Sequence, residues 1–85
     1  MSPREVFLTK SALRVLEGAG TPGVGREAWM DQTSILAQSP LTTADQEALI
    51  ERVLRNGWVQ SYRDPILEQV RYVLSGPGSL ALGVL

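Results

Sequence analysis

The sequence predicts a mainly helical domain that ends in a small β-hairpin, an α+β fold. Through residues 43–56 the apolar residues recur every three or four positions, as on one face of a helix. From Trp58 onward they alternate along two short segments, as in strands. The length of 85 residues suits one domain over 1–85 with a single modest core. We divide it into a core unit over 8–75 and an apolar C-terminal tail over 76–85.

The first part of the chain predicts one helix between an extended arm and a loop. The apolar residues 6–8 suggest a short strand or an arm that packs on the body. Thr9 is a plausible N-cap for a helix over 10–17, because its side chain can accept a backbone hydrogen bond. Residues 18–25, "GAGTPGVG", match the G-x-G-x-x-G motif of dinucleotide-binding loops. The residues before them have a helical period rather than that of a strand, so we interpret this stretch as a loop.

A second helix is predicted over residues 26–37. Trp29, Thr33, Leu36 and Ala37 stand at i, i+4, i+7 and i+8, which defines one buried stripe. We expect Trp29 to belong to the core rather than to a ligand-stacking site.

The third helix, over about 43–56, has the clearest boundaries. Thr42 and Asp45 approximate a capping box at its start. Gly57 ends it, because glycine adopts the left-handed conformation without steric cost. The residues expected to face inward are Leu49, Ile50, Val53 and Leu54.

A hairpin follows, with strands over 58–63 and 69–74 joined by the turn "DPILE" at 64–68. Ile66 and Leu67 are two branched apolar residues at the tip of that turn. They either fold back over the sheet or are buried against a partner.

Composition excludes several functions. The net charge is −1, and neither histidine nor cysteine occurs. The usual transition-metal ligands and the commonest general base are therefore missing, so we expect no enzyme, no metal and no cofactor. No apolar run is long enough to span a bilayer. We expect a cytoplasmic protein by elimination.

The stretch "LIERVLRNGWVQSYRDPILEQVRYVLS" (49–75) resembles the winged helix-turn-helix superfamily. Its parts look like a recognition helix, a helix-to-strand junction at a glycine, and a wing. The resemblance covers about residues 8–75 and implies three helices followed by a two-stranded wing. The segment 31–43 is longer than the tight turn of the simplest members, which leaves the presentation of the third helix open.

The resemblance implies DNA binding, with the third helix in the major groove and the wing on the backbone. Thr43 and Gln46 would reach base edges, and Arg63 and Arg71 would reach phosphates. The full set of DNA-contact candidates is Thr43, Gln46, Arg52, Arg55, Arg63 and Arg71. The acidic side chains on the same helix oppose this interpretation, because they would repel phosphate.

Two function classes therefore remain. The first is a DNA-binding protein, such as a small dimeric transcription regulator. The alternative is a winged-helix module that binds another protein without touching DNA. The candidates for partner binding are Ile66, Leu67, Leu80, Leu82 and Val84. The alternation of the last three would suit a strand that pairs with a second copy across a two-fold axis, giving a homodimer. In the competing interpretation, the tail packs on its own helices.

Overall fold

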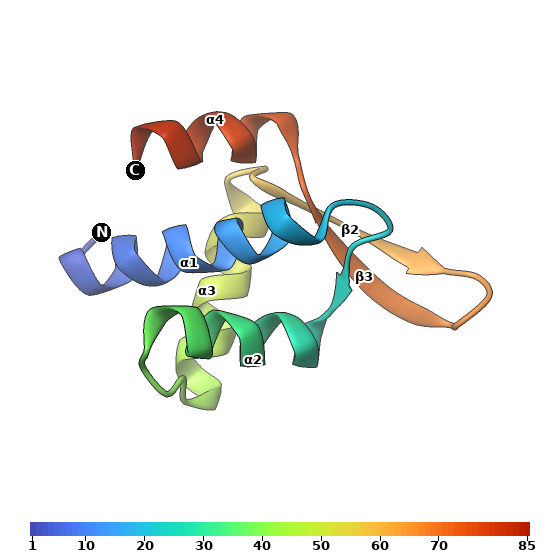
Figure 1. Cartoon of the computed structure of the whole chain (residues 1–85), viewed down its shortest axis with the longest axis horizontal. Helices are drawn as coiled ribbons and strands as arrows, with labels where there is room; N and C mark the ends of the chain where they lie inside the picture. Colours follow the sequence, from blue (N-terminus) through green and yellow to red (C-terminus); the bar gives the residue numbers. More distant parts are fainter.

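A computed structural model describes all residues, 1–85. It is an α+β fold of four helices and a three-stranded antiparallel sheet (Figure 1). In chain order the elements are α1 (Pro3–Ala19), β1 (Val24–Gly25), α2 (Arg26–Ala37), α3 (Thr43–Arg55), β2 (Val59–Asp64), β3 (Gln69–Leu74) and α4 (Gly76–Val84). The fold thus has one helix and one strand more than the sequence predicts.

The first helix begins much earlier than predicted. Ser2 and Glu5 form a capping box, and Pro3 occupies the first turn, where its missing N–H has no cost. The expected strand or arm over 6–8 is therefore wrong, because these residues are helical. Thr9 is not an N-cap either. It is fully buried within α1, and its hydroxyl donates a hydrogen bond of 2.7 Å to the carbonyl of Glu5.

The second and third helices are confirmed, apart from one inward residue in each. Thr42 and Asp45 form the expected capping box at the start of α3. Leu36 and Leu54, however, are exposed. In α2 the buried stripe runs through Trp29, Met30, Thr33 and Ala37, so Leu36 lies beside it rather than in it. Leu54 likewise lies outside the buried face of α3, which consists of Leu49, Ile50 and Val53.

The hairpin is confirmed, and a short third strand extends it. The junction between α3 and β2 is Gly57, with φ of 72° as expected. The β2 and β3 strands pair over their full lengths, and β1 pairs along the other edge of β3. A side chain at Gly23 would collide with the carbonyl oxygen of Tyr72. The absence of a Cβ therefore allows the loop before β1 to approach the sheet closely.

The C-terminal tail is a helix, so the predicted strand is wrong. Ser75 caps α4 by accepting a hydrogen bond from the Gly78 N–H, and Pro77 lies in the first turn. The Ser75 hydroxyl also donates to the Gly57 carbonyl at 2.5 Å, which fixes the helix start to the α3–β2 junction. Gly78 lies against the Trp58 carbonyl, where no side chain fits.

One core joins all four helices to the sheet. Trp29 has no exposed surface, and its Nε1 donates to the Ala12 carbonyl of α1 at 2.9 Å. Its ring lies 4.9 Å from that of Tyr72 on β3, centroid to centroid. Trp58 and Leu82 are partly buried against the same core. The expectation that Trp29 is a core residue is confirmed.

Candidate interaction surfaces

The outer face of α3 carries few free cations. Thr43 is exposed at its start. Gln46 is half-buried, and its side-chain amide donates to the Leu41 carbonyl at 3.2 Å. Arg55 is exposed and lies 3.5 Å from Glu51, one turn earlier. Of these three predicted contact residues, only Thr43 has a side chain without an internal partner.

Arg52 joins α3 to α1 and does not project outward. Its Nη2 lies 2.5 Å from Oε2 of Glu5, and its Nη1 is 3.4 Å from the Thr9 hydroxyl. The Arg52 side chain is only 15% exposed. Glu5 also accepts from the backbone N–H of Ser2, and these contacts lower the pKa of Glu5, the Ser2 backbone bond most strongly. The Arg52 guanidinium therefore serves the packing of two helices.

A second ion pair joins the same two helices near their starts. Arg4 donates two parallel hydrogen bonds to Asp45, at 3.1 and 3.2 Å. The Arg4 bonds and the backbone N–H of Thr42 lower the pKa of Asp45. The Asp45 carboxylate consequently stabilises both the cap of α3 and its contact with α1.

Within the β2–β3 hairpin, Arg71 is also held internally. Its Nη1 donates to the Gly23 carbonyl at 3.1 Å, and its Nε lies 3.6 Å from Asp64. The Asp64 carboxylate accepts hydrogen bonds from the backbone N–H groups of Ile66 and Leu67, at 2.9 and 3.2 Å. These two bonds are the main reason why the pKa of Asp64 is lowered. Arg63 is exposed and forms no ion pair.

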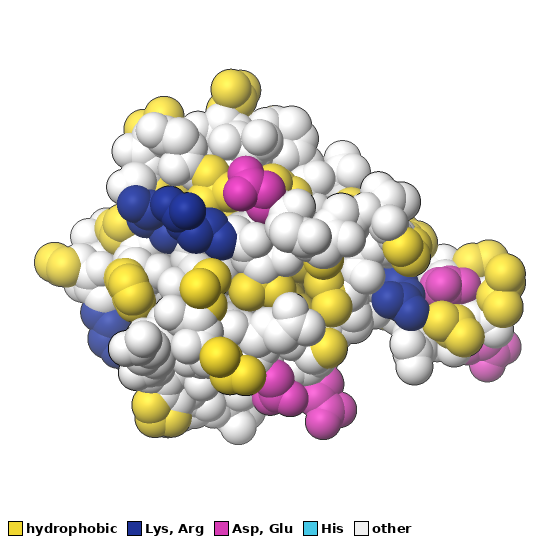
Figure 2. Space-filling view, viewed as in Figure 1, with side chains coloured by type: hydrophobic (Ala, Val, Ile, Leu, Met, Phe, Trp, Pro, Cys, Tyr) yellow, Lys and Arg dark blue, Asp and Glu magenta, His cyan; other side chains and the backbone are white.

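The tip of the β2–β3 hairpin is apolar and projects away from the body (Figure 1). Ile66 is 88% exposed and Leu67 is 53% exposed, and Val70 beside them is also exposed. Figure 2 shows hydrophobic side chains gathered at the end of the hairpin, next to charged ones. Of the two alternatives for Ile66 and Leu67, folding back over the sheet is therefore wrong. The Asp64 hydrogen bonds hold the turn that presents them.

Of the tail residues predicted to bind a partner, two are available. Leu80 and Val84 are exposed on α4, one turn apart. Leu82 is partly buried against the chain's own core, together with Ala81 and Leu85. The tail thus packs largely on its own domain.

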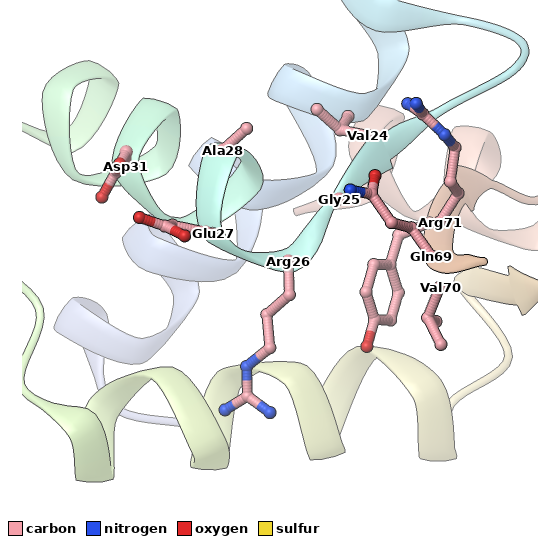
Figure 3. Close-up of a pocket in the computed structure, with 10 residues that line it drawn as sticks. Val24, Gly25, Arg26, Glu27, Ala28, Asp31, Gln69, Val70 and Arg71 are labelled. Carbon is pink, nitrogen blue, oxygen red and sulfur yellow. The ribbon is translucent and has the colours of Figure 1, made fainter. Parts of the chain in front are cut away.

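The largest hollow lies between the start of α2, β1 and β3, with a volume of about 790 Å³ (Figure 3). Arg26, Glu27, Asp31, Gln69 and Arg71 contribute its polar side chains. In Figure 3 the Arg26 side chain extends toward α3, whereas the guanidinium of Arg71 points in the opposite direction. The polar groups do not converge on one point, so this hollow forms no compact site for a charged ligand.

Sequence reasoning missed a smaller groove between α1 and α2. Its lining includes Phe7, Lys10 and Arg14, which lie on one face only because the helix includes Phe7, and α1 in fact begins at Pro3. The capping-box pattern of Ser2 and Glu5 is the sequence feature that predicts the earlier start of this helix.

No three carboxylates gather into a group that could hold a metal ion. None of the four helices combines the length and the apolar character that a bilayer crossing requires. Comparisons of the chain with protein-family models, with curated proteins and with solved structures gave no match.

Proposed function

We propose that this chain is a winged-helix interaction module that binds another protein through the tip of its wing. The order of three helices and a hairpin, with α3 passing through Gly57 into β2, supports the winged-helix assignment. In such a fold the wing and α3 are the elements offered to a partner. The chemistry of these two elements decides which partner is favoured.

The exposed apolar tip of the wing carries the proposal. Ile66 and Leu67 stand on a turn whose backbone is held by Asp64, so little order must be gained when a partner binds. Full burial of such a side chain stabilises a complex by about 1.5–3 kcal/mol before the costs of association. A phosphate backbone offers no apolar surface to either side chain. A hydrophobic cleft on a protein does.

Charge supports the same choice. Residues 43–74, which span α3 and the hairpin, contain four arginines and five carboxylates, a net charge of −1. Two of the four arginines, Arg52 and Arg71, are largely covered and bonded internally. Non-specific affinity for DNA comes almost entirely from free cations that replace counterions. This surface has too few of them to hold a duplex firmly.

DNA binding remains the second candidate, because Thr43, Arg55 and Arg63 are exposed on α3 and the wing. If Arg55 and Arg63 each contact one phosphate, replacing both with alanine lowers the slope of log K against log salt by about two. Fluorescence anisotropy of a labelled duplex at two salt concentrations measures this slope.

The test of the main proposal places a photo-crosslinking amino acid at Leu67 in the full chain and, as a control, at Val84. We expect a discrete protein adduct in the source cells from position 67 and not from position 84. The adduct partner, purified, should then bind Ile66→Ser/Leu67→Ser about 30-fold more weakly than the wild type. Equal binding by this variant would contradict the proposal. Micromolar binding of a duplex at low salt, reduced by Arg55→Ala/Arg63→Ala, would favour DNA.

A further inference from the structure

A groove between α1 and α2 has the chemistry of a second binding surface, distant in sequence from the wing. It has a volume of about 360 Å³ and is lined by Phe7, Lys10, Ser11, Arg14 and Leu36. The first four stand at i, i+3, i+4 and i+7, so they form one stripe along α1. Leu36 faces that stripe from α2.

The apolar part of the groove is incompletely buried. Phe7 is 51% exposed and Leu36 is 48% exposed, although both are large hydrophobic residues. Scattered exposed apolar residues are common, but these two line one concave surface. A partner side chain placed between them would remove apolar surface from water on both helices.

The basic part of the groove is unpaired. Lys10 and Arg14 lie one turn apart, and neither forms an ion pair with any carboxylate. Even Glu17, three residues after Arg14, forms none. Figure 2 shows basic side chains over α1 with hydrophobic side chains beside them. This pattern contrasts with Arg4 and Arg52, each of which has a carboxylate partner within the chain.

We propose that this groove binds an acidic, amphipathic helix of a partner protein. The α1 and α2 helices run antiparallel (Figure 1), and the furrow between two such helices accepts a third helix. Apolar side chains of the bound helix fill the space between Phe7 and Leu36. Carboxylates four residues apart on its flank pair with Lys10 and Arg14. The surface is independent of the wing, so this proposal stands or fails separately from the proposed function.

Other occupants fit the groove less well. A nucleic acid has phosphates for the two cations but no aliphatic side chain for Phe7 and Leu36. An anionic membrane surface is usually recognised by clusters of about four to eight basic residues, and this groove supplies two. An acidic helix complements both the charge and the apolar lining.

The test uses the full chain and a fluorescent, designed helical peptide of about 15 residues. Its leucines recur at helical spacing, and glutamates occupy one flank. We expect saturable binding by anisotropy, and binding weakened about tenfold or more in Lys10→Glu/Arg14→Glu. The matched control Arg26→Glu/Arg63→Glu reverses two unpaired, exposed arginines elsewhere and should bind as the wild type does. Ile66→Ser/Leu67→Ser should also bind normally, which separates this surface from the wing.

Three results would overturn the proposal. The first is equal binding of a peptide in which lysine replaces every glutamate. The second is unchanged binding in both Lys10→Glu/Arg14→Glu and the milder Lys10→Gln/Arg14→Gln. The third is binding to phosphatidylserine vesicles that Lys10→Glu/Arg14→Glu abolishes, without any binding of the peptide, which would assign the groove to a membrane surface. Thermal melts followed by circular dichroism confirm that each variant is folded.

Discussion

The basic side chains of α3 and those in the middle of α1 differ in whether they form ion pairs within the chain. Arg52 and Arg55 on α3 each have a carboxylate partner, whereas Lys10 and Arg14 on α1 have none. The resemblance to DNA-binding proteins predicted a contact surface on α3, yet of these two helices it is α1 that carries the unpaired basic side chains. The number of basic residues on a helix therefore says little about its partner. What counts is how many of them the fold leaves unpaired.

The largest expected effect comes from breaking the partly buried ion pair between Arg52 of α3 and Glu5 of α1. Arg52→Glu places two carboxylates together beside the covered stem of residue 52, although Glu5 itself stays partly exposed, and removes the contact to Thr9. We expect a loss of about 1–2 kcal/mol in the free energy of unfolding, measured by urea denaturation, because solvent screens the carboxylate while the Arg52 stem and its hydrogen bonds are lost. The matched change Arg14→Glu, on an exposed and unpaired residue, should alter it by no more than about 0.5 kcal/mol. Equal losses in the two variants would contradict the comparison.

The second largest effect is expected at acid pH, where protonation of the ion-paired carboxylates should lower the stability of the fold. The pKa values of Glu5, Asp45 and Asp64 are all lowered in the folded chain. The unfolded chain therefore binds more protons in this range, and stability falls as the pH falls. The contribution is complete above about pH 5, since unfolded carboxyl groups titrate near pH 4, and it is lost as the pH falls through the lower folded values.

Urea midpoints measured from pH 6 down to about pH 2 test this expectation. Asp45→Asn should reduce the fall in the urea midpoint at acid pH (the acid limb), because the amide cannot lose a proton or pair ionically with Arg4. The matched substitution Glu47→Gln removes an exposed carboxylate that forms no ion pair, so Asp45→Asn should change the acid loss of stability more than Glu47→Gln does. An acid limb that persists in full in Asp45→Asn would argue against the role of this pair.

The smallest effect is expected for self-association through α4. This helix presents apolar residues without any charge, unlike α1 and α3. Leu80 and Val84 are exposed, but residues 76–85 contain no charged side chain. A stable dimer usually buries about 800 Å² per partner, more than Leu80, Val84 and the small apolar hollow beside them supply. We therefore expect a monomer at tens of micromolar in sedimentation, and only weak association at higher concentration, reduced by Leu80→Ser/Val84→Ser. A stable dimer that survives this variant would place the interface elsewhere.

The parts of the fold that sequence predicted share one property: their signals are local. The capping box at Thr42, the helical period of α3 and the stop at Gly57 all lie within a few residues of the structure they specify. The alternation of β2 and β3 around the turn is equally local. The candidate residues Ile66 and Leu67 followed from the same pattern.

The parts that sequence missed depended on distant contacts or on competing local signals. The apolar run at 6–8 suited a strand as well as a helix, and the cap at Ser2 decided for the helix. The β1 strand has two residues and exists because the loop at Gly23 meets Tyr72, which no local pattern records. Arg52 and Glu5 lie 47 residues apart in the sequence, so no local pattern indicated that Arg52 would be paired rather than free.

By itself, the sequence determined the α+β class, two of the helices, the hairpin and the absence of histidine and cysteine chemistry. Only the tertiary structure decided that the tail is a helix on its own core, which arginines are unpaired and which apolar residues line a groove. The physical reason is range. Hydrogen bonds of caps and turns, and the periods of helices and strands, are set by neighbours along the chain. Burial and ion pairing are set by whichever residues the fold brings together.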